Sequence, residues 1–248
     1  MPFDLDLILM LIPIAMLAGI VRGYAGFGFA AIAVVGLNFF LPPSQSVPVV
    51  LGLDVLCSFS LWRQAMKQAD FQTLKLLIIG AIIGIPIGLS LILFIPEEIL
   101  KFAICVVILI LALVLMFDFR LRRAEAKSTK LGFGLASGIG TAGASVGGPM
   151  IVCYMLSSPL DTRTQRATMI LFFIASEALA MMALFAGGLV DLDIIKMLFL
   201  LLFPTLVAVR IGQWFFNRNP PKSLKHFSLP ILLLVSILGI SASVNSLF

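Results

Sequence analysis

The chain has 248 residues, of which 61% are hydrophobic and only 12% are charged. An average soluble chain is about a quarter charged, so this composition excludes a soluble domain and indicates an integral membrane protein whose core is made by packing helices in lipid. The net charge of +5 is explained by basic loops beside a membrane, and we expect no nucleic-acid partner.

Residues that bind metals or carry out catalysis are scarce. A single histidine, His226, follows a basic loop, and the three cysteines lie far apart in apolar runs. One histidine supplies neither a His-rich zinc motif nor a Ser-His pair. We therefore expect no metal, no cofactor and no enzymatic activity. We interpret the cysteines as small buried side chains; they are Cys57, Cys105 and Cys153.

The first half of the chain opens with a long apolar segment, residues 7–41, that is interrupted in its middle. Gly23, Gly26 and Gly28 fall within six residues there, and each glycine weakens a helix by about 1 kcal/mol. We predict two arms of roughly 15 residues each, too short to cross a ~30 Å hydrocarbon layer, which favours a re-entrant hairpin. Three uninterrupted helices are expected to follow, near 48–62, 72–95 and 99–117.

A polar stretch, DFRLRRAEAKSTK, divides the chain into halves. We predict one transmembrane domain made of a first repeat (1–118), a basic cytoplasmic linker (119–130) and a second repeat (131–248). The second repeat opens with another broken segment, 131–157, in which GIGTAGASVGG is followed by Pro149. Its three uninterrupted helices are expected near 166–187, 192–214 and 226–246.

The two halves match each other in the same order. Gly19 aligns with Gly138 and Gly28 with Gly147, an offset of 119, and the ends of the halves align at an offset of 124. The common order of the matches indicates a duplicated unit. The aligned ends are 88–101 and 212–225.

The basic residues predict how the halves are oriented. If each broken segment returns to the side of the membrane on which it started, twelve Lys and Arg residues lie on one side and two on the other. If each broken segment crosses the membrane once instead, eight lie on one side and six on the other. The positive-inside rule favours the first arrangement. Each half then makes three full crossings, so the halves are inverted relative to each other and both termini lie outside. The count leaves open whether each broken segment is a re-entrant hairpin or a pair of full crossings. The twelve are Arg63, Lys67, Arg120, Arg122, Arg123, Lys127, Lys130, Arg163, Arg166, Arg218, Lys222 and Lys225, and the two are Lys101 and Lys196.

Inverted repeats with broken helices are typical of secondary transporters. We expect the two glycine-rich turns to meet near the middle of the bilayer, where backbone N–H groups at the start of each half-helix bind an anion. The alternative is that the glycines only let helices pack closely. The residues predicted to bind substrate are Arg22, Tyr24, Gly26, Phe27, Gly28, Thr141, Ser145, Gly147, Gly148 and Arg210.

Four charged residues within apolar runs have two interpretations each. Arg22, at the first break, is the candidate for direct contact with an anion, and the alternative is an ion pair with a structural acid. Arg210 lies nearer the basic side, where snorkelling explains it as well. Asp54 and Glu177 align at an offset of 123. Both are candidates for proton coupling, Glu177 being the stronger, and the alternative for each is a structural arginine partner.

The sequence resembles the TauE/SafE sulfite exporter family, also called the 4-toluene sulfonate uptake permease family. The resemblance is carried by GYAGFGFA in the first half, by GIGTAGASVGGPMIVCYML in the second, and by two related halves around a basic linker. It implies seven or eight helices and the transport, by export in most members, of sulfur-containing anions such as sulfite and organosulfonates. The residues themselves indicate only an anion near the bilayer midplane.

The residues and the resemblance together predict a secondary transporter that exports sulfite or a small organosulfonate across the bacterial inner membrane by alternating access. The expected partners are this small anion and membrane lipid, with protons as a candidate coupling ion, and a homo-oligomeric state stays open. Two alternatives remain: an anion channel that uses the same donors, and an importer of another small oxyanion or carboxylate.

Overall fold

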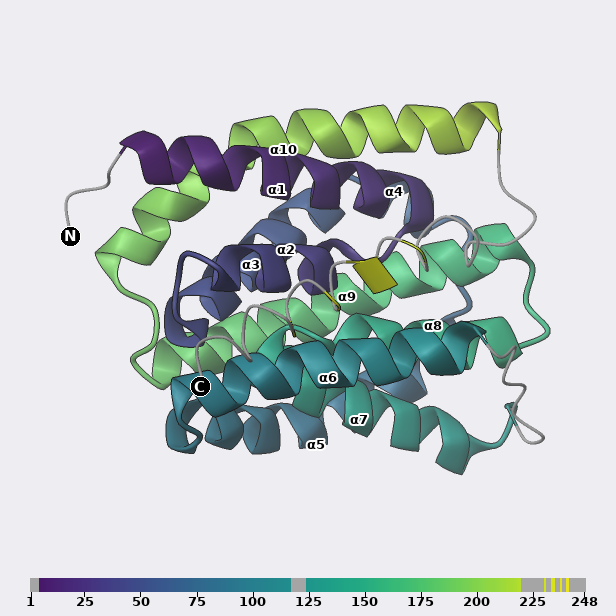
Figure 1. The fold of residues 1–248 in the computed structure, drawn as a ribbon. Helices are drawn as coiled ribbons and strands as arrows, with labels where there is room; N and C mark the ends of the chain where they lie inside the picture. Colours follow the sequence, from purple (N-terminus) through teal and green to yellow (C-terminus); the bar gives the residue numbers. More distant parts are fainter. Residues whose placement is uncertain are drawn as a thin grey trace.

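The computed structural model describes residues 5–116 and 124–219, together with single positions between 230 and 240. Part of the predicted linker and most of the helix predicted near 226–246 lie outside the described residues. Within the described ranges every regular element is an α-helix, which confirms the all-α prediction (Figure 1). The helices of the first half are α1 (Leu5–Ala25), α2 (Phe29–Asn38), α3 (Pro43–Phe59), α4 (Trp62–Ala65), α5 (Phe71–Phe94) and α6 (Glu97–Met116). Those of the second half are α7 (Lys127–Ala144), α8 (Gly147–Ser157), α9 (Thr162–Ala186) and α10 (Leu192–Arg218).

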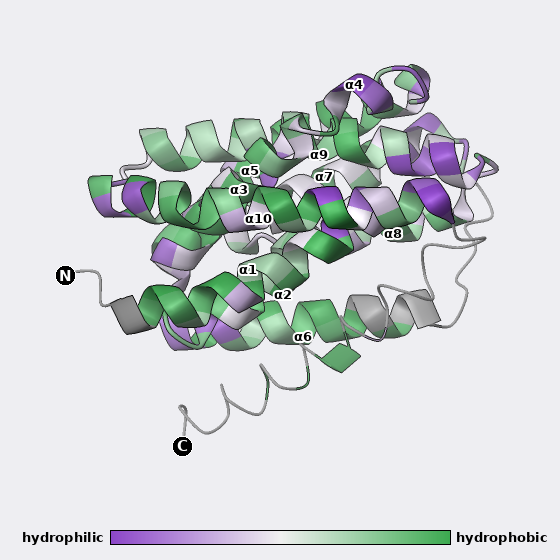
Figure 2. Ribbon diagram, turned by 90° about the horizontal axis from the view of Figure 1, so that it is seen from above, coloured by the Kyte–Doolittle hydropathy of each residue, from purple (hydrophilic) through white to green (hydrophobic). Residues whose placement is uncertain are grey.

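Long apolar helices and a lipid-facing surface confirm a multi-pass membrane protein. Among the described residues, four helical stretches are long and apolar enough to cross a membrane. The side chains of Phe94, Phe199 and Phe203 are 82%, 73% and 75% exposed, a surface that suits lipid rather than water. Figure 2 shows hydrophilic residues gathered at the end of the molecule where α4 lies. The four stretches are Leu7–Ala25, Phe71–Phe94, Thr162–Ala186 and Leu192–Arg218.

Both glycine-rich segments break the helix, as predicted, but the arms are unequal. In the first, α1 has 21 residues and α2 has 10; in the second, α7 has 18 and α8 has 11. The prediction of two arms of similar length is therefore wrong. At 1.5 Å per residue, α1 is about 32 Å long and can cross the hydrocarbon layer, whereas α2 reaches about halfway. The difference arises because α1 begins early, at Leu5, and continues to Ala25, past Gly23, so that the break lies late in the segment.

Left-handed backbone marks both breaks. Gly26 and Gly28 have φ of +79° and +92°, and Ser145 has φ of +56°. Glycine adopts this region without steric penalty, whereas serine does so at a cost. Pro149 falls in the first turn of α8, where its missing N–H removes no helical hydrogen bond.

Helices of the two halves are interleaved rather than side by side. α10 packs against α1 and α3, while α5 packs against α7 and α9, and α3 contacts α9. Figure 1 shows the α1–α10 pair at one edge of the bundle and α5 with α7 at the opposite edge. Each half therefore lends one long helix to the broken segment of the other.

The two interleaved contacts use aligned residues. A Cβ atom placed on Gly88 of α5 would lie 2.9 Å from the backbone nitrogen of Gly143, and one placed on Gly212 of α10 would lie 2.9 Å from that of Tyr24. Gly212 follows Gly88 by 124 residues and Gly143 follows Tyr24 by 119, which are the offsets of the sequence alignment. The match favours a duplicated unit.

Several glycines of the broken segments serve close helix packing. A Cβ on Gly19 would lie 3.0 Å from the carbonyl oxygen of Thr205, and one on Gly138 would lie 2.5 Å from that of Ala81. At these two aligned positions, small side chains let the helix backbones approach, as the alternative interpretation holds.

Candidate functional site

Arg22 lies in the last turn of α1, just before the first break, and is 1% exposed. Its Nε atom lies 3.0 Å from Oδ1 of Asp54. Nη1 donates a 2.9 Å hydrogen bond to the carbonyl oxygen of Gly26, and Nη2 donates to the hydroxyl of Ser58. Both Nη atoms therefore donate to protein acceptors, whereas Nε makes ion-pair contact with Asp54 but has no hydrogen-bond partner among the described residues. The acid partner named in the alternative interpretation is present.

Asp54, on α3, places its carboxylate at the start of α2. The backbone N–H of Ala30, in the first turn of α2, lies close to this carboxylate. An N–H group in this turn has no partner within the helix, and the end of the helix carries partial positive charge. The amide end predicted to bind a substrate anion thus holds a carboxylate of the protein itself.

Glu177, on α9, is 2% exposed and lies within hydrogen-bonding reach of Asp54. Two carboxyl groups form a hydrogen bond only if one of them supplies a proton. If the pair shares one proton, it carries a single negative charge, and this charge would balance that of Arg22. The Oε2 atom of Glu177 is buried and has no hydrogen-bond partner within the described part of the chain.

The second break presents hydroxyl groups. Ser145 is 1% exposed, and its hydroxyl has no hydrogen-bond partner among the described residues. Ser137 donates a 2.9 Å hydrogen bond to the carbonyl oxygen of Gly147. A Cβ on Gly147 would overlap the hydroxyl of Thr141. Glycine at this position therefore lets the start of α8 approach α7 closely.

Phe173, on α9, lies between the two breaks and was missed by the sequence analysis. The Cζ atom of Arg22 lies 4.7 Å from the centre of its ring, and a Cβ on Gly148 would lie 3.7 Å from the ring's own Cζ atom. Phe173 precedes Glu177 by four residues, so the two side chains share one face of α9. That spacing is the signal by which Phe173 could have been found.

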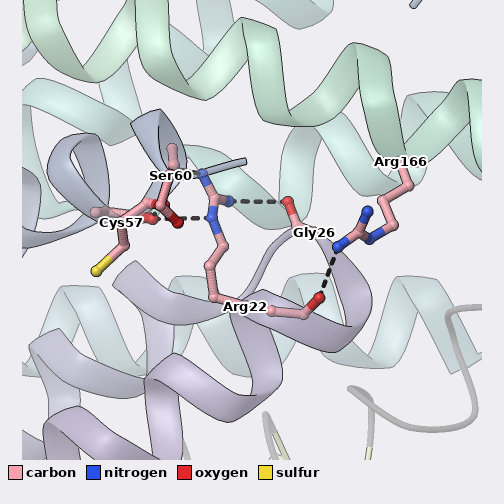
Figure 3. A network of polar contacts seen from close by, with 8 residues as sticks. Arg22, Gly26, Cys57, Ser60 and Arg166 are labelled. Carbon is pink, nitrogen blue, oxygen red and sulfur yellow. Dashed lines mark hydrogen bonds and ion pairs between the residues drawn. The ribbon is translucent and has the colours of Figure 1, made fainter. Parts of the chain in front are cut away.

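Arg166 was counted from the sequence only as a basic residue near the membrane surface. It is 4% exposed. Its Nη2 donates a 2.6 Å hydrogen bond to the carbonyl oxygen of Gly23, and its Nε donates to that of Tyr24 at 3.3 Å. These carbonyls lie in the last turn of α1, where a cation offsets the negative end of the helix. Figure 3 shows Arg22 and Arg166 on either side of Gly26.

A model of the family described as sulfite exporter TauE/SafE matches residues 11–238. The chain belongs to the TauE/SafE family. Neither the curated proteins nor the solved structures compared with it contain a match. Membership confirms the family resemblance and identifies a multi-pass membrane protein of a transporter family of the sulfite and sulfonate type.

The two glycine-rich motifs of this TauE/SafE protein form the two helix breaks. Phe27 is 1% exposed at the first break, and Gly28 is the N-cap residue of α2. The ring of Tyr24 meets that of Phe216 edge-on, with 6.1 Å between centroids. Tyr24 lies in the last turn of α1, and Phe27 and Gly28 lie between α1 and α2.

Arg210 is the one predicted binding residue that the structure does not bring to the breaks. It is exposed on the outer face of α10 and donates a 3.1 Å hydrogen bond to Gln213. Apolar side chains of α10, including Phe203, Ile211 and Trp214, line the groove around it. A long cation on this face extends along an apolar surface, in agreement with the snorkelling interpretation.

The remaining candidates for metal binding are dispersed. The thiols of Cys57, Cys105 and Cys153 are buried, as predicted, and are not joined in disulfides. Over the described part of the chain, no three His, Cys, Asp or Glu side chains gather closely enough to hold a metal ion.

Proposed function

We propose that this TauE/SafE protein exports sulfite or a small organosulfonate across the bacterial inner membrane by alternating access, and that the anion binds at the two helix breaks. The observation that carries the proposal is the position of Asp54. Its carboxylate lies between Arg22, at 3.0 Å, and the amide end of α2. A carboxylate and a sulfonate are both oxyanions that accept hydrogen bonds from guanidinium and amide groups. The substrate therefore competes with Asp54 for donors that already hold an oxyanion.

Hydrogen-bond donors at the second break support a single anion site formed by both breaks. The hydroxyl of Ser145 is buried and has no partner in the ranges that the structure describes, and the backbone N–H groups of Gly147 and Gly148 lie at the start of α8. The start of a helix is a general anion-binding position. Phe173 contacts Arg22 and flanks Gly148, so one side chain on α9 adjoins both breaks.

The interleaving of the halves supports alternating access. Because α5 packs against α7 while α10 packs against α1, a movement of one half displaces the broken segment of the other. Inverted halves that rock around a central site expose it to each side in turn. The inside-negative membrane potential favours efflux of an anion by about 2.3 kcal/mol per charge per 100 mV.

Proton-coupled uptake is a second candidate, favoured by the contact between Asp54 and Glu177. If a substrate displaces Asp54 from Arg22, the two buried carboxyl groups are left together without their cation. A second proton then relieves the uncompensated charge, so one proton enters with each monovalent anion. Such transport is electroneutral, and a pH gradient with the more acidic side outside drives uptake.

Counterflow in proteoliposomes tests the proposal. We expect internal unlabelled sulfite or sulfoacetate to accelerate uptake of the labelled anion, and an inside-negative potential to accelerate efflux. Flux without acceleration by trans substrate identifies a channel, and flux that follows the pH gradient but not the potential identifies proton-coupled uptake. Absence of flux with sulfite, sulfoacetate and taurine contradicts the proposed substrate class. Arg22→Ala should abolish transport, with Lys75→Gln, at an exposed position of α5, as the matched control.

A further inference from the structure

We infer that the basic end of the protein, which carries Arg63, Lys67 and Arg163, has a second anion-binding site, here called the vestibule. The vestibule collects the substrate, and the side chain of Phe216 separates it from the first helix break. The inference rests on the proposed transport of an anion and adds the route by which the anion reaches the break. Gln64, Gln68, Arg163, Phe216 and Asn217 line the vestibule.

The lining of the vestibule is suited to an anion. The cleft has a volume of about 330 Å³, which is at the lower end of the range for small-molecule sites. Three side-chain amides and one guanidinium line it, each with N–H donors, and none of the lining residues is acidic. Arg163 is exposed, so its charge is available to an ion arriving from the basic side.

Asp161, the acidic residue nearest to Arg163 along the chain, already accepts hydrogen bonds. Asp161 caps the start of α9, where its carboxylate accepts hydrogen bonds from the backbone N–H groups of Arg163 and Thr164 and from the Thr164 hydroxyl. These bonds lower the pKa of Asp161, the Thr164 hydroxyl contributing most, and the carboxylate offsets the amide end of α9. The side chain of Arg163 lines the cleft.

Phe216 separates the vestibule from the buried arginines. It lines the cleft, yet only 4% of the residue is exposed. The Cζ atom of Arg166 lies 4.1 Å from the centre of its ring. Arg166 in turn binds the carbonyls of Gly23 and Tyr24 at the end of α1. An anion in the vestibule therefore reaches Arg166 only when the ring of Phe216 moves.

Three arginines form a sequence from the surface to the break. Arg163 lines the cleft, Arg166 lies behind Phe216, and Arg22 lies beyond Gly26. Arg163 and Arg166 are one helical turn apart at the start of α9, and Figure 3 shows Gly26 between Arg166 and Arg22. Successive cations attract an anion inward without holding it at a single position.

Cysteine modification tests the vestibule without measuring transport. Gln68→Cys adds an exposed thiol to a protein whose own three cysteines are buried. We expect an anionic methanethiosulfonate reagent that carries an ethylsulfonate group to modify it faster than a cationic analogue. Arg163→Gln should lower the anionic-to-cationic rate ratio roughly three- to tenfold, an effect that salt weakens. Sulfoacetate should slow the anionic reaction; it is used because sulfite itself cleaves disulfides.

A control thiol outside the cleft and a variant of Phe216 define which results would contradict the vestibule. Ser128→Cys is exposed at the basic end but outside the cleft, and its rate ratio should not respond to Arg163→Gln. Equal ratios at the two thiols, or a ratio at position 68 that Arg163→Gln leaves unchanged, would overturn the vestibule even if wild-type flux is normal. Phe216→Ala should expose Tyr24→Cys to the anionic reagent, and an unchanged rate there would overturn the role of Phe216. If the thiols react as expected but the wild-type protein transports none of the tested anions, only the proposed transport is contradicted.

Discussion

Arg22 and Asp54 form an ion pair inside the helix bundle, with 3.0 Å between Nε and Oδ1 and 1% of each residue exposed. The pair joins α1 to α3 at the point where the first broken segment changes direction. Removal of one partner leaves an uncompensated charge in a low-dielectric interior, which costs about 3–5 kcal/mol.

Variants that remove the charges of Arg22 and Asp54 distinguish a structural role of the pair from a role in substrate binding. We expect Arg22→Met and Asp54→Asn each to lower the unfolding temperature in detergent. Arg22→Met leaves the two carboxyl groups without their cation, and Asp54→Asn removes the carboxylate that lies 3.0 Å from the guanidinium. The double variant should recover most of the stability but transport no anion, because the guanidinium is absent. Normal counterflow in the double variant would show that the pair only supports the fold. The exposed pair Lys196–Asp193, also 3.0 Å apart, is the control, and Asp193→Asn should leave stability unchanged.

Glu177→Gln tests proton coupling. The amide donates a hydrogen bond to Asp54 without a proton from solution, so the variant should retain counterflow while its flux no longer responds to an imposed pH gradient. Full pH-driven flux in the variant would contradict the role of Glu177. Glu98→Gln, an exposed acid in the first turn of α6, serves as the control and should behave as the wild type.

Close packing of α5 against α7 predicts a contrast between two glycines. A Cβ on Gly84 would overlap the carbonyl oxygen of Leu135 and lie 2.9 Å from the nitrogen of Ile139, whereas one on Gly132 meets nothing within 4 Å. Gly84→Ala should destabilise the protein by about 1–3 kcal/mol, because the helices must separate. Gly132→Ala should leave stability unchanged or raise it by up to about 1 kcal/mol. Thermal unfolding in detergent measures both, and equal shifts would contradict the close contact.

Ser145 combines a left-handed backbone with a buried hydroxyl that no described residue hydrogen-bonds. Ser145→Gly should stabilise the protein by about 1 kcal/mol, since glycine adopts φ of +56° without strain. Ser145→Ala keeps the strain and should not. If the hydroxyl donates to the substrate, both variants should raise the KM for counterflow to a similar extent. An unchanged KM in both would remove Ser145 from the binding site.

Local sequence features predicted the elements well. Glycines clustered within apolar runs located both breaks, and the helices α5, α9 and α10 lie within a few residues of their predicted ranges. These features depend on neighbouring residues, so they can be recognised without knowledge of the fold. The lengths of the arms were missed because helix ends depend on capping and packing as well as on the position of the glycines.

The site was predicted in part. Arg22, Asp54 and Glu177 were selected because a charge in an apolar run is costly, and the structure brings them together. Arg210 was selected by the same argument but lies on the outer face. Phe173 gave a weaker signal, its spacing of four residues from Glu177, because aromatic residues are common in membrane helices. Arg166 gave none, because an arginine beside a loop is common.

The amino-acid sequence by itself determined that this chain is a helical membrane protein with two interrupted segments at matching positions, because hydropathy and glycine content act within single helices. Only the tertiary structure decided that Asp54 occupies the amide end of α2 and contacts Glu177, and that Phe216 covers Arg166. Those contacts depend on how each helix is rotated about its axis and which helix it packs against. Such choices are fixed by side chains distant in sequence, through close packing in the assembled bundle.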